Sequence, residues 1–245
     1  MPSTSFIQPD WPAPGRVRAA STTRRGGVSG GPWRGLNLAT HCGDAAADVW
    51  RNRDLLRRAL GLPTEPVWLE QVHGCDVRRL PSPDDPADAV WTTTPGVVCT
   101  ILTADCLPVL LCDRGGGMVA AAHAGWRGLA AGVLETTLQA LPVEPCRLMA
   151  WLGPCIGPDA FEVGEDVRSA FCSGTPIARA AFKPARRPAH WFADLARLAR
   201  DRLMAAGVED IHGGIWDTFS DPLRFYSYRR DGRTGRMATM IWLEA

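Results

Sequence analysis

Short apolar runs separated by polar junctions fill the middle of the chain and constrain its fold more than any other feature. The runs occupy residues 97–102, 108–112 and 118–122, and the junctions at 103–106 and 113–117 are polar or rich in glycine. Apolar runs of this length between turn residues are typical of buried strands. We therefore expect a buried sheet in this region, with a tight hairpin between its last two strands.

Amphipathic patterns on both sides of this region predict further elements. Residues 48–60 place their apolar side chains on one stripe and are followed by Gly61, which indicates a helix with a glycine C-cap. Residues 67–73 alternate in character, so we expect a strand that ends at His73 with Gln71 on the same face. Helical patterns also cover 129–141 and 191–203, and closing strands are expected at 208–216 and 237–242.

Strands and helices mix without a regular βαβ repeat, and the absence of GxGxxG and GKS/T segments argues against a nucleotide-binding loop. A chain of 245 residues with 46% apolar content and no shift in composition can bury one substantial core. We expect an α+β fold, in which residues 16–245 form a single catalytic domain with mixed β-sheets packed against helices as a layered sandwich. Residues 1–15, rich in proline, are expected to form an extended arm, and residues 24–35, rich in glycine, a flexible loop.

The charge of the chain favours a small-molecule protein. With 27 basic and 26 acidic residues the net charge is +1, which gives no overall field for nucleic acid or an anionic membrane. The first residues lack a leader pattern, and the apolar stretches are far shorter than the about 20 residues of a membrane span. The eight cysteines form no CxxC pair, which is typical of reduced thiols. We expect a cytoplasmic protein without nucleic-acid or membrane partners; its oligomeric state stays open, and a monomer is plausible.

Two imidazoles and one thiol stand in polar segments beside the apolar runs. His73, Cys106 and His123 would together give three ligands to a soft divalent cation and leave a fourth position open, as in a catalytic zinc site. Their separations of 33 and 17 residues match no local metal-binding pattern. Each residue therefore also has a structural interpretation, as a buried thiol or a hydrogen-bonded histidine.

Several separate motifs, spread over nearly the whole chain, carry a family resemblance. They are Leu36–Leu38, Asn52–Arg53, Trp68–Gly74, Thr103–Val109, His123–Gly128, Gly153–Pro158, Phe225–Gly232 and Thr234–Arg236. In these motifs the chain resembles the laccase-domain family, which includes proteins of the YfiH and YlmD types. One position departs from the family pattern, because Asp217 stands before Thr218 where the family commonly carries a cysteine.

The resemblance implies a purine nucleoside phosphorylase that cleaves adenosine, inosine and methylthioadenosine with phosphate and also deaminates adenosine. It implies zinc as the cofactor, bound by His73, Cys106 and His123. Copper would be able to occupy the same ligands in vitro, because the affinity of nitrogen and sulfur donors peaks at Cu²⁺. A true copper oxidase is discounted, since its several copper centres need more imidazoles than the five in this chain.

Two alternatives to a nucleoside enzyme remain open at the level of sequence. Relatives of the YfiH type suggest a peptidoglycan-editing hydrolase that acts on a mis-made nucleotide-linked muropeptide precursor, where a metal could polarise an amide carbonyl. A non-enzymatic interpretation makes the zinc structural and the protein a partner-binding module. An open coordination position that holds water would argue against this last interpretation.

The implied chemistry requires more residues than the three ligands. Deamination needs a proton shuttle, for which Asp105 and Glu70 are candidates, although Asp105 could equally orient a histidine. Phosphorolysis needs cations that face phosphate, and here the candidates are Arg53, which the family pattern favours, and Arg127, which could instead bond loop carbonyls. The residues that could orient the ribose or stack on the purine are Asn37, Gln71 and Trp126.

Arginines alternate with aromatic residues near the end of the chain, in a pattern that resembles a nucleic-acid strip. These arginines are Arg224, Arg229, Arg230, Arg233 and Arg236. Because the net charge of the chain is close to zero, we expect them to fix loops through ion pairs, with one of them in contact with substrate.

Overall fold

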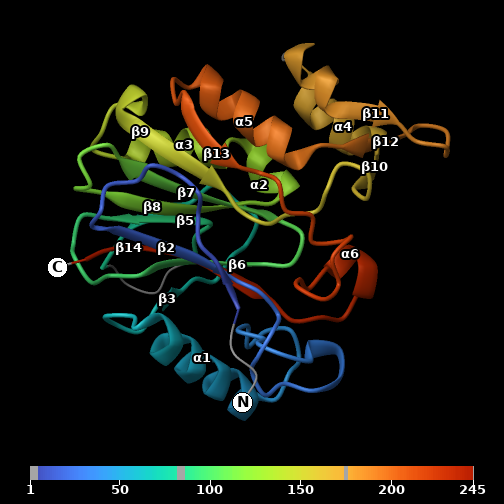
Figure 1. The fold of residues 1–245 in the computed structure, drawn as a ribbon. Coiled ribbons are helices and arrows are strands. Elements are labelled where there is room, and N and C mark those ends of the chain that lie inside the picture. Colours follow the sequence, from blue (N-terminus) through green and yellow to red (C-terminus); the bar gives the residue numbers. More distant parts are fainter. Residues whose placement is uncertain (1–4, 82–85, 174–175, 245) are drawn as a thin grey trace.

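Two β-sheets lie face to face at the centre of the molecule, and helices cover the outer face of each (Figure 1). The computed structural model describes residues 5–81, 86–173 and 176–244. One sheet contains β4 (Val77–Arg79), β5 (Ala89–Thr92), β7 (Leu107–Asp113), β8 (Val119–Ala124), β9 (Leu148–Leu152) and β13 (Asp210–Gly213), in the order β13-β9-β7-β8-β5-β4. The other contains β1 (Phe6–Ile7), β2 (Val17–Thr22), β3 (Val67–Trp68), β6 (Cys99–Thr103) and β14 (Met237–Leu243), in the order β1-β2-β14-β6-β3.

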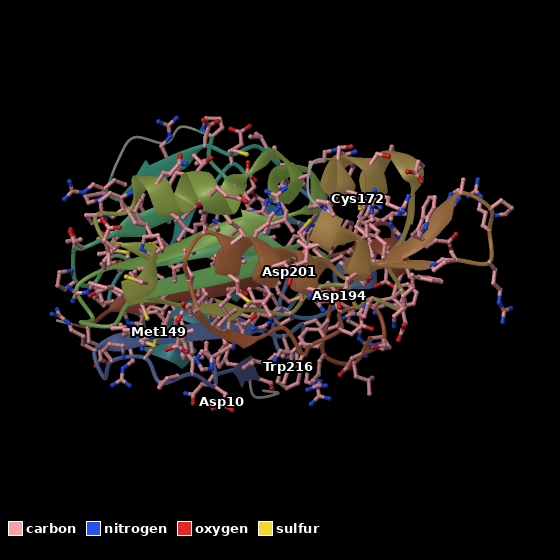
Figure 2. All side chains as sticks on the ribbon, turned by 90° about the horizontal axis from the view of Figure 1, so that it is seen from above. Asp10, Met149, Cys172, Asp194, Asp201 and Trp216 are labelled. Atoms are coloured by element: carbon pink, nitrogen blue, oxygen red, sulfur yellow. The ribbon has the colours of Figure 1, made fainter. Side chains whose placement is uncertain are left out.

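Helices complete the layers on both outer faces. The outer face of the six-stranded sheet packs against α2 (Trp126–Ala131), α3 (Val133–Ala140) and α5 (Leu195–Ala205), and the five-stranded sheet packs against α1 (Ala46–Leu60). A small sheet of β10 (Glu162–Gly164), β11 (Phe182–Pro184) and β12 (His190–Ala193) lies beside α4 (Glu165–Cys172). In the view from above, Cys172 of α4 and Met149 of β9 lie toward opposite ends of the molecule (Figure 2). The short helices are α6 (Tyr228–Asp231), η1 (Gly31–Trp33), η2 (Pro145–Arg147) and η3 (Pro176–Ala181).

Alternation of side chains along the central strands builds three apolar layers. In β7, Leu110 packs between the two sheets, whereas Val109 and Leu111 pack under the helices. In β6, Ile101 lies between the sheets and Leu102 packs toward α1. Strands covered on both faces are typically apolar along most of their length. The buried strands predicted for 97–122 are confirmed as β6, β7 and β8. The last two of these, β7 and β8, form the predicted hairpin.

The predicted helix at 48–60 is confirmed as α1. Gly61 follows it with a φ of 59°, a left-handed conformation in which its N–H can reach the carbonyl oxygens of the last turn. Arg53 lies within this helix on its buried side. The helix therefore carries one candidate site residue at a fixed position beneath the five-stranded sheet.

The strand predicted for 67–73 is wrong in its length, because β3 ends at Trp68. Beyond that point the side chain of Gln71 takes the place of a strand partner: its amide donates to the carbonyl of Leu102 (2.9 Å) and accepts from the N–H of Leu102 (2.8 Å). His73 has a φ of 61°, which turns the backbone out of any strand. The segment after Trp68 is therefore a loop, although its residues alternate as in a strand. Side-chain hydrogen bonds determine its shape.

Two predicted helices and one predicted strand have different bounds in the structure. The helix predicted at 129–141 is two helices, α2 and α3, because Gly132 between them has a φ of 102°. The helix predicted at 191–203 begins only at Leu195, since Trp191 belongs to β12 and the Asp194 carboxylate caps the helix by accepting from the N–H of Arg197. The strand predicted at 208–216 is limited to β13.

The N-terminal segment and the glycine-rich segment are both tied to the rest of the fold. Within the predicted arm, β1 pairs antiparallel with β2, and residues 1–4 lie outside the described part. The segment 24–35, expected to be a flexible loop, is held by Asn52 of α1, which accepts from the N–H of Val28 (2.8 Å) and donates to the hydroxyl of Ser29 (2.9 Å). Among the described residues, no helix has the length and apolar content needed to cross a membrane.

Candidate metal centre and its cavity

His73, Cys106 and His123 converge from three parts of the chain. A ligand atom of each lies within 4.8 Å of the others, and Cys106 Sγ is 3.8 Å from His73 Nε2. A tetrahedral zinc ion with ordinary bond lengths separates a sulfur and a nitrogen ligand by about 3.6 Å. The three donors therefore have the chemistry and the spacing that a zinc-type ion requires.

The register of the central hairpin accounts for the meeting of Cys106 and His123. Pro108 of β7 pairs with His123 of β8, and Leu107 pairs with Ala124, so the residue that precedes β7 lies beside the end of β8. His73 reaches the same point from the loop that follows β3. Strand order and register bring the three donors together, so the spacing of these residues in the sequence does not predict that they meet.

Asp88, which the sequence reasoning missed, holds two of the three donors. Its fully buried carboxylate accepts from His123 Nδ1 (2.7 Å) and from the backbone N–H groups of Val72 (3.2 Å), His73 (3.0 Å) and Gly74 (2.6 Å). The bond at Nδ1 leaves Nε2 of His123 as the nitrogen available to a metal. The only local signal was an acidic residue between two alanines at the start of an apolar strand.

The charges at this centre favour a thiolate. Burial by itself raises the pKa of the Cys106 thiol, but the imidazoles of His123 and His73 outweigh that effect and lower the pKa to about 6. Burial lowers the pKa of His123, but the Cys106 thiolate and the Asp88 carboxylate outweigh it and raise the pKa to about 9. Since the deprotonated sulfur is the form that binds metal ions, the site fits a soft divalent cation.

Two glycines allow the donors to approach one another. A Cβ on Gly125 would lie 3.0 Å from Cys106 Sγ and 3.0 Å from His73 Cδ2, and one on Gly128 would lie 2.8 Å from the carbonyl oxygen of Gly74. Gly125 is also the N-cap of α2, so this helix begins at Trp126, three residues before the predicted helical pattern. Both glycines are needed for close approach, because any side chain there would push against the centre.

A cavity of about 580 Å³ opens beside the three donors, a size suited to a small-molecule ligand. Its wall includes the aromatic side chains Trp126, Phe161 and Tyr228. It also includes the guanidinium groups of Arg127, Arg229 and Arg236 and the imidazole of His41. His41 and Phe161 were not among the site residues expected from the sequence.

Asp105 lies at the cavity, but both of its carboxylate oxygens are occupied by protein donors. The hydroxyl of Thr218 donates to Oδ1 (2.6 Å), and the hydroxyl of Ser227 (3.0 Å) and the N–H of Arg229 (2.7 Å) donate to Oδ2. Its φ of 90° is a left-handed conformation. Through these contacts Asp105 joins the strand junction to the C-terminal segment. Glu70, the other shuttle candidate, lines a neighbouring cavity.

The expected substrate-binding residues lie at different distances from the cavity. Gln71, Trp126 and Arg127 line it, although the amide of Gln71 is engaged by Leu102. Arg53 lines the neighbouring cavity instead. Asn37 is fully buried, where its amide donates to the carbonyl of Ala39 (3.1 Å) and to Asp44 Oδ2 (2.9 Å) and accepts from the N–H of Arg236 (2.9 Å). The structure therefore brings Asn37 to a loop junction and not to the cavity.

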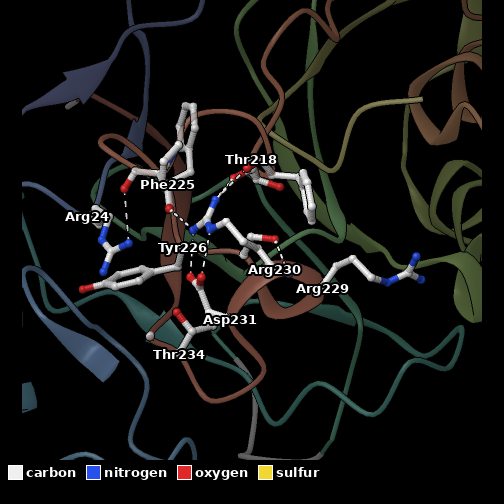
Figure 3. A network of polar contacts seen from close by, with 12 residues as sticks. Arg24, Thr218, Phe225, Tyr226, Arg229, Arg230, Asp231 and Thr234 are labelled. Atoms are coloured by element: carbon white, nitrogen blue, oxygen red, sulfur yellow. Dashed lines mark hydrogen bonds and ion pairs between the residues drawn. The ribbon is translucent and has the colours of Figure 1, made fainter. Parts of the chain in front are cut away.

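The arginine-rich segment near the C-terminus fixes loops, as predicted (Figure 3). Arg230 donates to the carbonyl of Thr218 (2.9 Å) and forms an ion pair with Asp231 (2.7 Å). Arg229 and Arg236 line the cavity instead. One segment thus both closes the fold and supplies cations to the candidate site.

Asp217, where the sequence departs from the family pattern, stabilises a loop next to the cavity. Its Oδ1 accepts from the N–H groups of Gly157 (2.8 Å) and Phe219 (2.9 Å). A carboxylate accepts two such bonds better than the weakly accepting sulfur of a cysteine. The substitution therefore has a structural role in the loop that carries Ile156 at the cavity wall.

Comparisons with known proteins agree over nearly the whole chain. Residues 18–244 match the family described as "Multi-copper polyphenol oxidoreductase laccase". A protein of Pseudomonas aeruginosa named as a purine nucleoside phosphorylase is 56% identical over 98% of this chain and 99% of its own. The purine nucleoside phosphorylase YfiH of Escherichia coli is 53% identical, with 98% and 99% covered.

Solved structures extend the likeness to three dimensions. A Neisseria meningitidis protein of the DUF152 family has a TM-score of 0.93 at 49% identity, with 98% of this chain and 99% of that chain covered. YlmD from Geobacillus stearothermophilus has a TM-score of 0.85 at 30% identity, with 98% and 96% covered. The single-domain fold of mixed sheets and helices expected from the sequence is therefore confirmed.

Proposed function

The chain belongs to the multi-copper polyphenol oxidoreductase laccase family, as its motifs indicated, and we propose that it is a zinc-dependent purine nucleoside phosphorylase. It would cleave adenosine, inosine and methylthioadenosine with inorganic phosphate to the free base and ribose 1-phosphate or its 5-methylthio analogue. Deamination of adenosine would be a second activity. The observation that carries the proposal is a cavity lined both by the His73, Cys106 and His123 donors and by three arginines.

The charges on the cavity wall support an anionic co-substrate. Arg127, Arg229 and Arg236 line it, and the acidic residue among the described lining residues is Asp105, whose oxygens are already occupied. Unneutralised guanidinium groups attract phosphate and bind its oxygens in a planar, bidentate manner. Phosphate would thus enter a site in which positive charge is already arranged, without a competing carboxylate.

The aromatic wall supports a purine. Trp126, Phe161 and Tyr228 border the same cavity as the metal donors. Flat aromatic side chains bind the face of a base by stacking. A nucleoside between this wall and the arginines would place its glycosidic bond close to phosphate, with Gln71 and Asp105 fixing the shape of the surrounding loops and not touching the base.

His73, Cys106 and His123 would hold the metal ion. A bound Zn²⁺ supplies Lewis acidity toward an oxygen or nitrogen of the substrate. Asp88 fixes the orientation of His123 and the backbone of His73, so that both rings are in place before a substrate arrives. Copper would occupy the same donors in vitro.

The names of the relatives favour a nucleoside substrate over a muropeptide precursor. An open cavity beside the donors favours an enzyme over a structural metal site. The reduced thiols expected from the sequence suit a cytoplasmic location, which we include in the proposal.

The test is an assay of the purified protein with adenosine, with and without phosphate, that follows adenine, inosine and ribose 1-phosphate. Adenine and ribose 1-phosphate should form in equal amounts only with phosphate, and Cys106→Ser should abolish their formation. Cys75→Ser is the control, because Cys75 is a half-buried thiol outside the donor set. If the wild type forms neither base nor inosine, and Cys106→Ser does not change its metal content, the proposal is wrong.

A further inference from the structure

A cavity separate from the metal donors lies along the glycine-rich segment 24–35. It has a volume of about 600 Å³, and it shares no lining residue with the metal cavity. Residues of the segment form most of its wall, and Pro222 and Leu223 complete it. Its described lining residues include no acidic side chain but three arginines, Arg24, Arg25 and Arg34. The cavity is therefore a cationic hollow outside the candidate metal centre.

Two consecutive glycines carry the main chain along this cavity. Gly26 and Gly27 have φ values of 82° and 73°, a left-handed conformation that favours glycine. A Cβ on Gly27 would lie 2.5 Å from the carbonyl oxygen of Gly35 and 2.7 Å from Asn52 Oδ1, so the segment packs closely on that side. In the part of the chain that the structure describes, the N–H groups of Gly26 and Gly27 have no hydrogen-bond acceptor. Unpaired N–H groups of glycine-rich loops are main-chain donors that commonly bind phosphate.

The three arginines differ in how much of their donor capacity the fold uses. Arg24 serves the fold, because it donates to two main-chain carbonyls and lies over the ring of Tyr226 (Figure 3). Arg25 donates through Nε to the carbonyl of Leu223 (3.3 Å). Among the described residues, the side chain of Arg34 has no hydrogen bond and no ion pair. The terminal nitrogens of Arg25 and the whole guanidinium of Arg34 are thus left to a ligand.

Two carboxylates lie near the cavity, and both accept hydrogen bonds from other groups. Asp221 forms an ion pair with Arg224, which is not a lining residue. Asp44 accepts from the hydroxyl of Ser29 (2.6 Å) and from the amide of Asn37 (2.9 Å). In the described part of the chain, neither carboxylate forms an ion pair with the three arginines of the cavity. Three guanidinium charges therefore outnumber the single carboxylate charge of Asp44, and the excess attracts anions.

We propose that this cavity binds a small molecule through two adjacent phosphoryl groups, with Arg25 and Arg34 as the cations that hold it. Each guanidinium can bind phosphate oxygens in a bidentate manner, so separate arginines suit a ligand with more than one anionic group. Val28 and Leu223, which are 43% and 73% exposed, border the same cavity and can contact an apolar part of the ligand. A nucleoside diphosphate and free pyrophosphate share this chemistry. The site requires neither the metal ion nor the proposed phosphorolysis.

The test measures binding by calorimetry on the metal-loaded full chain, with pyrophosphate, ADP and inorganic phosphate as probes. The variants are Arg25→Gln and Arg34→Gln, and Arg24 is kept because it holds the fold. Arg186→Gln is the matched control, because Arg186 is an exposed arginine between β11 and β12 that has no ion pair in the described part of the chain. Thermal unfolding shows that each variant is folded.

Labelling of arginines locates the bound probe, because the metal cavity also contains guanidinium groups. Phenylglyoxal modifies accessible arginines, and peptide mass spectrometry measures the extent of modification at each one. Saturating pyrophosphate should suppress the modification of Arg25 and Arg34 and leave that of Arg186 unchanged. Protection confined to the arginines of the metal cavity would overturn the proposed site.

Pyrophosphate and ADP should bind the wild type more tightly than inorganic phosphate. Arg25→Gln and Arg34→Gln should each raise both dissociation constants about tenfold, and Arg186→Gln should match the wild type. An equal loss in all three variants would show a general effect of charge and overturn the site. Inorganic phosphate that binds as tightly as pyrophosphate would also overturn it, because the ligand would then need only one phosphoryl group.

The comparison of ADP with pyrophosphate distinguishes the two sources of the ligand. Tighter binding of ADP would support the site with a nucleotide as its ligand, whose nucleoside contacts Val28 and Leu223. Equal or tighter binding of pyrophosphate would support the site with the diphosphate group alone as its ligand.

Discussion

His123 donates its Nδ1 hydrogen to Asp88 Oδ1 over 2.7 Å, in a place where Asp88 is fully buried and His123 is 3% exposed. The same carboxylate binds the backbone N–H of His73. One acidic side chain thus fixes the ring of one proposed ligand and the backbone of another. The arrangement of His73 and His123 therefore rests on Asp88, which is not itself one of the three donors.

Asp88→Asn should weaken metal binding about 10- to 100-fold, as is usual when a partner of a metal-bound histidine is lost. The neutral amide cannot match a carboxylate that accepts from His123 and three backbone N–H groups. Competition with a chromophoric chelator measures the affinity. Asp76→Asn, at an exposed acidic residue nearby, is the control. Equal affinities of Asp88→Asn and the wild type would show that His123 is oriented by other contacts.

Asp88 should also make stability depend on pH. Burial by itself raises its pKa, but the hydrogen bonds from His123 and Gly74 outweigh burial and lower it. A carboxyl group with a lowered pKa in the folded state contributes its stability fully above the ordinary carboxyl range, and loses it as the pH falls through and below that range. In urea unfolding of the metal-free protein, the wild type should have a higher free energy of unfolding than Asp88→Asn at neutral pH. This difference should become smaller in acid. A difference that is constant with pH would contradict the expected coupling.

Gly125→Ala should impair the centre more than the fold. The added methyl group would lie 3.0 Å from both Cys106 Sγ and His73 Cδ2, so the donors must move apart. We expect metal affinity to fall about tenfold or more. The free energy of unfolding should fall by about 1–3 kcal/mol. Gly30→Ala is the matched control, because no atom lies within 4 Å of a Cβ at that position. The metal content after dialysis and the midpoint of urea unfolding measure the two effects.

Cys106 should be the most readily alkylated thiol of the metal-free protein near neutral pH. With a pKa of about 6, most of it is thiolate at pH 7, whereas an ordinary thiol with a pKa of about 8.5 is mostly protonated. The rate of its reaction with iodoacetamide should rise with pH to a plateau, with a midpoint near 6, and zinc should suppress it. Peptide mass spectrometry locates the label. Cys99 and Cys155 should stay unlabelled in the folded state, since burial raises the pKa of each. A midpoint in the ordinary thiol range would show that the imidazoles do not stabilise the thiolate.

Asp105→Asn separates a positioning role from a proton shuttle. An asparagine tolerates the φ of 90°, but it loses the charge that accepts from Thr218, Ser227 and Arg229. We expect a loss of about 1–3 kcal/mol of stability, or roughly 2–4 °C in Tm for each kcal/mol. Activity per folded, metal-loaded molecule should keep the wild-type pH profile. An unchanged Tm together with an altered pH profile would assign the shuttle to Asp105 instead.

Local sequence was sufficient for the elements whose pattern reflects burial. The apolar runs from 97 to 122 predicted central strands because both faces of each strand are covered, and the stripe with Gly61 predicted α1 because a left-handed glycine ends a helix. Where a long-range contact overrides the local pattern, prediction failed: Asp88 and Gln71 hold the segment after Trp68 out of the sheet. The sequence shows a glycine at position 132, but it did not predict that the helix divides there.

The sequence by itself determined the layered core. It also indicated His73, Cys106 and His123 as a candidate donor set, because imidazole and thiolate groups bind soft divalent cations. Only the tertiary structure decided that they meet, since the pairing of β7 with β8 and the path of the chain after β3 set their separation. It also decided that Asp88 supports His123 from 35 residues away and His73 from 15 residues away. The occupied oxygens of Asp105 and the separation of Arg53 from Arg127 are likewise set by the tertiary structure. Side chains distant in sequence become neighbours through strand order and register, which local patterns of polarity do not encode.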